Sequence, residues 1–504
     1  MPAHALGHPD MAEAPAGRAA ARGAAVLGAS QAVRIVTSFA SSIFVARLLT
    51  PADYGVMAMV APVMGFILIF QNLGLNQAII QRRTISAQEI NGTFWLNIIA
   101  TIIIAALFIL IAPLVGLFYE DDRAIGLMAA SGLTVIATGI ASQHLALLNR
   151  HMRFGALSAV ETVNAVTQLA ATIALAWWLR TYWALFFGML AGVAAGSALA
   201  WWYERWRPSL HRLDLRATRS MLAMGVDITG FNLLNFVCRN LDNLLIAKRW
   251  GAGELGLYDR SYRLMLMPLQ TINQPLGKIM LPTLSRALDR PEAYRGMYLL
   301  AVRALVMVIV PGAVALSVCS TTVIVLLLGE QWRDAGPIFA WLSLTAAIQP
   351  VSNATGWLFI SCGRTRSMVR WGVISAVLTV TSFVVGLPWG ATGVAAAYAV
   401  SEVLRIPVLY RMATRGTPVA ARDLYAVLLP TLLGAGLCVI AVLALRDTLD
   451  PLSLLGVAIA LSYLLATLGQ AATAEGRAGL WRLWILARST MGRTGLRPAA
   501  EHGA

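Results

Sequence analysis

Polar and charged residues recur at helical spacing inside two apolar segments of the chain. In segment 24–47 they are Gln31, Arg34, Ser38, Ser41 and Ser42. Adding 201 to each number gives polar residues of segment 220–247: Asn232, Asn235, Arg239, Asp242 and Asn243. Residues spaced by three, four or seven lie on one face of a helix. Each segment therefore carries one polar stripe, and the arginines of these stripes have the planar forks that hold phosphate oxygens well.

Arg239 is the charge that lies deepest in its segment. It precedes Lys248, at the end of the same segment, by nine residues, which is about 13 Å along a helix axis. A charge near mid-membrane costs about 2.5–3.5 kcal/mol, so it is expected to face water, a partner or a substrate. Two interpretations follow. Arg239 lines a central cavity, or it pairs with Asp242 three residues later and holds the helices together.

A further arginine, Arg303, lies eight residues beyond Arg295, roughly 12 Å along a helix. It either joins the cavity or extends its guanidinium to the cytoplasmic headgroups. The candidate substrate-binding residues are Arg34, Asn235, Arg239, Asp242 and Arg303. No catalytic, cofactor-binding or metal-binding residue is expected. The cysteines show neither metal-ligand spacing nor a disulfide framework, and no loop is long enough to hold a soluble catalytic domain.

The composition identifies a membrane protein. The 504 residues are 58% hydrophobic and only 12% charged, whereas soluble domains carry about 25% charged residues. The net charge is 39 minus 24, or +15. In a membrane protein such an excess usually reports positively charged cytoplasmic loops, so we do not interpret it as nucleic-acid binding.

Fourteen segments are long and apolar enough to be transmembrane helices, each needing about 20 residues. They are 24–47, 54–74, 92–118, 124–147, 157–179, 182–203, 220–247, 256–280, 297–328, 336–360, 368–388, 391–410, 424–445 and 452–473. The fold class expected is therefore an all-α membrane protein. It comprises two pseudo-symmetric six-helix lobes and two further C-terminal helices.

The loops alternate in charge along the chain. Arginines gather in one set of loops, around 82–83, 150–153, 205–219, 286–295, 364–366 and 411–422, and in the C-terminal tail. Acidic or mixed residues occupy the other set, around 120–123, 330–334 and 446–450. The basic set belongs inside, which places both termini in the cytoplasm.

The domain boundaries follow from these segments. They are a disordered cytoplasmic tail 1–23, an N-terminal lobe 24–203, a cytoplasmic loop 204–219, a C-terminal lobe 220–412, two further helices within 413–475, and a basic cytoplasmic tail 476–504.

A short motif after the first segment returns 201 residues later. Residues 45–56 and 246–257 each end one apolar segment and start the next. Corresponding pairs are Ala46 and Ala247, Arg47 and Lys248, Asp53 and Glu254, and Gly55 and Gly256. Because each half contains an even number of segments, the repeats are expected to be parallel and related by an axis along the membrane normal.

Three motifs carry a family resemblance. They are Ala-Arg-Leu-Leu-Thr-Pro-Ala-Asp-Tyr-Gly at 46–55, Leu-Tyr-Asp-Arg at 257–260 and Leu-Gly-Glu-Gln-Trp at 328–332. With the helix count, they resemble the bacterial polysaccharide-unit flippases. These form the polysaccharide-transport branch of the multidrug/oligosaccharidyl-lipid/polysaccharide exporter superfamily. The resemblance covers roughly residues 24 to 475.

The resemblance implies a function in the bacterial inner membrane. An undecaprenyl-pyrophosphate-linked oligosaccharide would move from the inner to the outer leaflet by alternating access, for exopolysaccharide, capsule or O-antigen assembly. Apart from this substrate and membrane lipids, the implied partners are a polysaccharide polymerase and export machinery. No cofactor and no nucleic acid are implied.

Two alternatives belong to other classes. A cation-coupled drug or metabolite exporter of the same superfamily is expected to carry an acidic residue inside the first lobe, where the first segment has Arg34. A membrane enzyme of polysaccharide assembly commonly needs a sizeable external loop or an acidic metal-binding motif. Neither is visible in the sequence, so we expect a transporter and not an enzyme.

Overall fold

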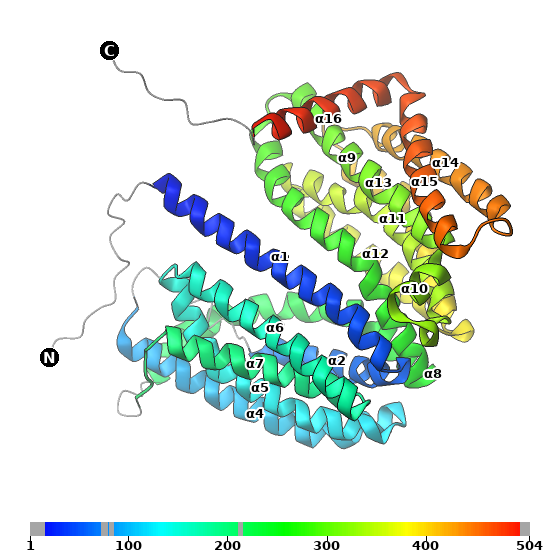
Figure 1. Ribbon diagram of the computed structural model, residues 1–504. Helices are drawn as coiled ribbons and strands as arrows, with labels where there is room; N and C mark the ends of the chain where they lie inside the picture. Colours follow the sequence, from blue (N-terminus) through cyan, green and yellow to red (C-terminus); the bar gives the residue numbers. More distant parts are fainter. Residues whose placement is uncertain (1–15, 72–78, 80–84, 210–214, 494–504) are drawn as a thin grey trace, which may run out of the picture. The chain divides into compact units, whose positions relative to one another are not determined.

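The computed structural model describes residues 16–71, 79, 85–209 and 215–493. This part of the chain contains fifteen α-helices and two short 3-10 helices (Figure 1). The first half contains α1 (Ala16–Leu48), α2 (Pro51–Gln71), α4 (Ala87–Tyr119), α5 (Asp122–Arg150), α6 (Phe154–Leu179) and α7 (Trp183–Tyr203). The second contains α8 (Leu215–Arg286), α9 (Pro291–Val318), α10 (Ser320–Leu328), η2 (Glu330–Trp332), α11 (Ala335–Ser361), α12 (Thr365–Gly386), η3 (Leu387–Trp389) and α13 (Gly390–Thr414). The chain continues with α14 (Ala421–Leu445), α15 (Pro451–Ala471) and α16 (Ala474–Arg493).

The expected all-α membrane architecture is confirmed. Within the described residues, eight helical segments are long and apolar enough to cross a membrane. They are Ala87–Tyr119, Asp122–Arg150, Phe154–Leu179, Trp183–Tyr203, Pro291–Val318, Thr365–Thr414, Ala421–Leu445 and Pro451–Ala471. The segment Thr365–Thr414 contains two helices, because the chain turns at Gly390, which has a positive φ of 71°.

The helices differ from the fourteen expected segments at four places. The seventh and eighth segments form one long helix, α8, which is interrupted only by the non-helical backbone of Gly251. The ninth divides at Cys319 into α9 and α10. Helix α1 begins at Ala16, inside the expected N-terminal tail. Helix α16 occupies most of the expected C-terminal tail, residues 476–504.

The turn between α4 and α5 shows how local chemistry sets the helix ends. Ser86 and Glu89 form a reciprocal capping box that starts α4. Glu120 ends the same helix in the left-handed conformation, at a φ of 58°. The next residue, Asp121, caps the start of α5 with its carboxylate. The result is a tight turn that presents the Glu120 side chain.

The helices group into two compact units. The first contains residues 1–259 together with 327–332. In it α6 packs on α7 and α1, and α5 packs on α4 and α7. Small residues allow these helices to approach closely. A Cβ at Gly188 would lie 1.9 Å from the Thr172 hydroxyl, and the Asn97 amide donates to Gly139 O at 2.9 Å.

The second unit contains residues 260–326 and 333–504. Helix α9 lies at its centre, in contact with α11, α14 and α15. Helix α12 packs chiefly on α13, which in turn packs on α11. Gly434 and Gly469 bring α14 and α15 together, since a Cβ at either would meet the backbone of the other helix within 2.3 Å.

The same pairings occur in both units. Helix α4 packs on α5, α5 on α7 and α6 on α7 in the first unit. Helix α9 packs on α11, α11 on α13 and α12 on α13 in the second. These are the pairings expected if the two halves are copies of one six-helix arrangement.

Candidate functional site

Arg34 lies on an exposed face of α1 and forms an ion pair with α6. Its Nη1 is 2.9 Å from Glu161 Oε2, and the two side chains are 47% and 53% exposed. Gln31 and Ser38 are exposed as well. The first polar stripe therefore lies at least partly outside the packed interior of its unit. Charges exposed in this way inside a membrane protein are expected to face water, a partner or a substrate.

The second stripe, on α8, is described only in part. The side chains of Asn235 and Arg239 lie outside the described residues. Asp242 is buried, and its carboxylate accepts a hydrogen bond from the Tyr258 hydroxyl at 2.9 Å and another from the backbone of Asn243. Asp242 thus connects the two sides of the Gly251 turn. Its binding of substrate stays a prediction, as does that of Asn235 and Arg239.

Arg303 of α9 is buried in the second unit, where its side chain contacts α15 and α16. Its Nε donates to Gln470 Oε1 at 3.2 Å, and its guanidinium lies against Gly479, where no side chain competes for the space. Gln470 in turn donates to Val427 O at 2.6 Å and to the Thr431 hydroxyl at 2.9 Å. Arg303 is therefore held by a polar network inside a helix bundle, and its binding of substrate stays a prediction.

The two copies of the repeated motif pack directly against each other within the first unit. A Cβ at Gly55 would lie 1.7 Å from Ala252 O, and a Cβ at Gly256 would lie 1.8 Å from Pro51 O. Adding 201 to 51 and 55 gives 252 and 256, so these are the same contact made twice in opposite directions. A reciprocal contact of this kind is what a two-fold axis between two copies produces. We call residues 45–56 and 246–257 the paired turns.

The cations of the paired turns each bind the C-terminal end of a helix from the other half of the sequence. Lys248 Nζ lies 2.7 Å from Glu120 Oε1 at the end of α4. Arg47 Nε donates to Leu327 O at 3.3 Å, at the end of α10. The hydrogen bond from Lys248 and its charge lower the pKa of the exposed Glu120 carboxyl, so the pair is ionised at neutral pH.

Residues of the motif at 328–332 donate hydrogen bonds to the carbonyl groups at the C-terminal end of α1. Gln331 Nε2 donates to Ala46 O at 2.7 Å and to Leu49 O at 2.8 Å. Trp332 Nε1 also donates to Ala46 O, at 2.8 Å, and its ring packs edge-on against Tyr54. The last carbonyls of a helix have no partner within the helix. Two motifs nearly 300 residues apart therefore complete one structure.

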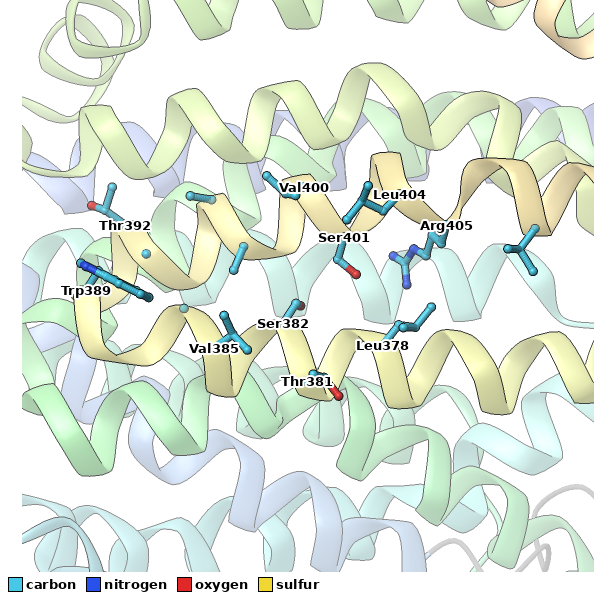
Figure 2. A pocket seen from close by; sticks show the side chains of 15 residues that line it. Leu378, Thr381, Ser382, Val385, Trp389, Thr392, Val400, Ser401, Leu404 and Arg405 are labelled. Atoms are coloured by element: carbon cyan, nitrogen blue, oxygen red, sulfur yellow. The ribbon is translucent and has the colours of Figure 1, made fainter.

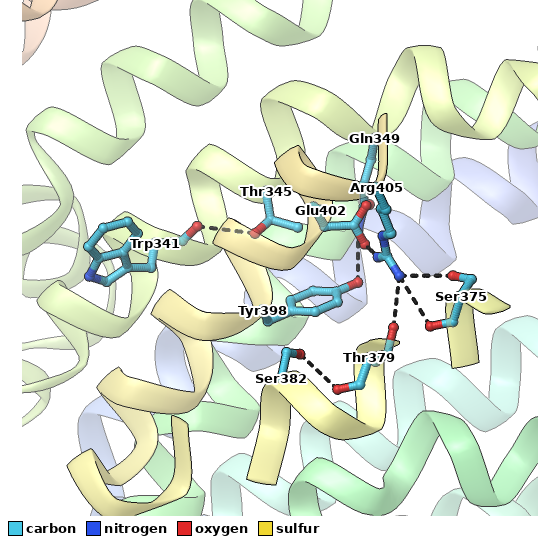
Figure 3. Close-up of polar contacts among 9 residues, drawn as sticks. All are labelled: Trp341, Thr345, Gln349, Ser375, Thr379, Ser382, Tyr398, Glu402 and Arg405. Atoms are coloured by element: carbon cyan, nitrogen blue, oxygen red, sulfur yellow. Dashed lines mark hydrogen bonds and ion pairs between the residues drawn. The ribbon is translucent and has the colours of Figure 1, made fainter. Parts of the chain in front are cut away.

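An apolar groove of about 820 Å³ lies between α12 and α13 (Figure 2). Trp389 lies beside it near the turn between the helices, and Arg405 lies further along. Arg405 forms an ion pair with Glu402 and donates to the hydroxyls of Ser375 and Thr379, both at 2.8 Å (Figure 3). The network fastens α13 to α12.

Sequence reasoning missed this buried pair. Glu402 and Arg405 stand three residues apart in segment 391–410, where opposite charges at that spacing share one helix face. That spacing is the signal that could have found them. Among the described residues, His, Cys, Asp and Glu form no group of three that could hold a metal ion.

Comparison with known proteins identifies the family. A family model described as "Polysaccharide biosynthesis protein" matches residues 44–337, which include both paired turns. The chain belongs to this family.

Two relatives and one solved structure show how far the similarity extends. The lipopolysaccharide biosynthesis protein WzxC of Escherichia coli (strain K12) is 22% identical over 72% of this chain and 75% of its own length. The succinoglycan biosynthesis transport protein ExoT of Rhizobium meliloti (strain 1021) is 23% identical over 66% and 67%. The structure of the lipid II flippase MurJ in an inward closed conformation aligns with a TM-score of 0.68 at 11% identity, over 88% of this chain and 98% of that one. This member of the polysaccharide biosynthesis family therefore has the same fold as MurJ.

Proposed function

We propose that this protein is a flippase for an undecaprenyl-pyrophosphate-linked oligosaccharide. It moves the unit from the inner to the outer leaflet of the bacterial inner membrane by alternating access. The product serves exopolysaccharide, capsule or O-antigen assembly. Membership of the polysaccharide biosynthesis family and the fold shared with a lipid II flippase support the proposal. So do relatives named for lipopolysaccharide biosynthesis and succinoglycan transport.

The proposed mechanism of alternating access rests on the reciprocal contact between the paired turns. Gly55 on Ala252 and Gly256 on Pro51 are equivalent contacts between two copies of one motif. A transporter built from two parallel repeats can close one end of its pathway by bringing such copies together, and open that end by separating them. A single rocking movement of the two repeats is then enough to bring the paired turns together or to separate them. This supports alternating access and does not require a catalytic group.

The proposed architecture is fourteen transmembrane helices, with both termini cytoplasmic. Two lobes of six helices form the transport pathway, and α14 and α15 lie outside the repeat. This assignment places the paired turns at the outer end of the pathway, because Glu120 and Glu330 lie in the acidic set of loops.

Arg34 is the described residue best suited to the diphosphate. Its guanidinium has five N–H donors, and Nη1 donates to Glu161. A carboxylate that is half exposed can be exchanged for the phosphate oxygens of a lipid-linked sugar. We place Arg239 with it as a second phosphate ligand.

Complementation tests the function. A strain that lacks the gene should accumulate the lipid-linked oligosaccharide on the inner leaflet, and the wild-type gene should restore export. Arg34→Ala should abolish export, whereas Glu161→Gln, which breaks the same ion pair but keeps the arginine, should retain it. Equal loss with both variants would show that the pair is structural. Normal export in the deletion strain, together with increased drug susceptibility, would instead identify a drug exporter.

A further inference from the structure

Helix α16 starts within three residues of the end of α15 and lies across the ends of α15 and α9 (Figure 1). Gly476 makes this sharp change of direction possible, because a Cβ there would lie 1.9 Å from Gln470 O. Gly479, one turn later, packs on the Arg303 guanidinium. One face of α16 is therefore docked onto the ends of membrane-crossing helices through two glycines.

The opposite face of α16 combines large aromatic residues with arginines. Trp481, Trp484 and Ile485 are 61%, 49% and 45% exposed. The two indole rings stack with their centroids 5.0 Å apart, and the Arg488 guanidinium lies 5.3 Å from the Trp484 ring centroid. Arg482 is exposed beside them. Such a surface is unfavourable in water but matches a membrane interface, where aromatic rings enter the headgroup region and arginines bind lipid phosphates.

The composition of α16 distinguishes it from a membrane span. Its sequence contains four arginines and one glutamate, a net charge of +3, in twenty residues. It is absent from the helical segments of the described chain that are apolar enough to cross a membrane, whereas α15, which leads into it, is among them. A basic helix that begins where a membrane-spanning helix ends must start at the membrane surface, because the short connection cannot carry it further away.

We propose that α16 is an in-plane helix that binds anionic phospholipids through Arg482 and Arg488, with Trp481 and Trp484 inserted into the headgroup region. The occupant of this face is lipid and not a protein partner, because the face continues the surface at which α15 leaves the membrane. Bound lipid holds α16 against Arg303 and so fixes the inner ends of α9 and α15. This inference does not depend on the cargo that the protein transports.

Hydrogen–deuterium exchange of the full-length protein in lipid nanodiscs tests the proposal. Nanodiscs of phosphatidylcholine alone are compared with nanodiscs that also contain phosphatidylglycerol. The α16 amides should exchange at least about tenfold more slowly in the anionic nanodiscs, since each surface arginine adds to the attraction. Arg482→Gln/Arg488→Gln should remove this difference. Trp481→Ala/Trp484→Ala should speed exchange in both lipids.

Arg366→Gln/Arg370→Gln on α12 is the matched control, because both of these arginines are exposed as well. It should leave the lipid dependence of α16 unchanged. Exchange of α16 that is the same in both lipids would overturn the proposal, and so would an equal effect of the control pair. Faster exchange at the inner ends of α9 and α15 is expected in the Arg482→Gln/Arg488→Gln protein, whereas a loss of protection along their whole length would indicate misfolding. In that case Arg482→Lys/Arg488→Lys, which retains the charge, decides: the proposal requires it to keep the lipid dependence, and loss of that dependence would overturn the proposal.

Discussion

Two of the arginines inside the apolar segments have very different surroundings in the structure, although the sequence predicts the same role for each of them. Arg34 pairs with Glu161 on an exposed face. Arg303, in contrast, is buried against Gln470 and the backbone at Gly479. A buried arginine that is hydrogen-bonded inside its bundle contributes to the packing of that bundle, whereas an exposed one keeps donors for a ligand.

Arg239→Ala is expected to abolish export while leaving the protein folded and inserted. Arg239→Lys should restore export only partly, because a point charge replaces a bidentate fork. Export measured in the deletion strain, with membrane expression as control, checks both. If Arg239 only pairs with Asp242, Arg239→Ala should lower expression instead, and Arg239→Ala/Asp242→Ala should recover it. Since Asp242 already accepts from Tyr258, we expect no such recovery.

Gln470→Leu is expected to destabilise the second unit by about 1–3 kcal/mol, because it leaves the buried Arg303 guanidinium without its acceptor. Thermal unfolding in detergent measures the change. Thr467→Ala, one turn earlier on α15, is the control. Its hydroxyl is exposed and bonds only to Tyr463 O of the same helix, so an equal loss with that variant would remove the special role of Gln470.

At the level of elements, the paired turns require glycine for two different reasons: Gly251 has a positive φ of 78°, whereas Gly55 and Gly256 allow a close backbone approach. At Gly55 and Gly256 a side chain would collide with backbone atoms, which cannot move aside as a flexible side chain can. At Gly253, in the second of the paired turns, a Cβ would meet nothing within 4 Å. The close approach, and not the flexibility of the turn, explains why the motif keeps these two glycines.

Gly55→Leu and Gly256→Leu are therefore expected to separate the paired turns and reduce export at least about tenfold, with an overpacking cost of about 1–3 kcal/mol. Hydrogen exchange at residues 246–257 should become faster in both. Gly253→Leu, placed in the same turn, should leave export and exchange near wild type. Wild-type export by Gly55→Leu would contradict the proposed closure.

At the level of the whole molecule, the charge pattern of the loops fixes the expected orientation. Reporter fusions after Asp122, Glu330 and Asp447 should read external, and fusions after Arg83, Arg212 and Arg290 internal. A matched pair across one helix, Glu330 and Arg364 on either side of α11, is the most stringent comparison. An internal reading at any of the first three positions would contradict the fourteen-span assignment.

The sequence by itself determined the helices and their repeat. Long apolar runs and the turn residues between them are local properties, so most helix positions agree with the expected segments. The exceptions include α8, which joins the seventh and eighth segments, and the break at Cys319, which divides the ninth. The offset of 201 found the paired turns for the same reason, since a repeat is visible in residue types alone. The sequence did not predict α16 within the basic tail 476–504, because its four arginines interrupt the apolar pattern from which the segments were chosen.

Only the tertiary structure decided which charges have partners. Asp242 meets Tyr258 across the Gly251 turn, Arg303 meets Gln470 from 167 residues away, and Arg405 reaches hydroxyls on α12. Such contacts depend on how helices pack, and the apolar pattern that specifies a span does not specify its neighbours. The close contact of Gly55 with Ala252 belongs to the same class: the motif predicted a correspondence, and packing turned it into a contact.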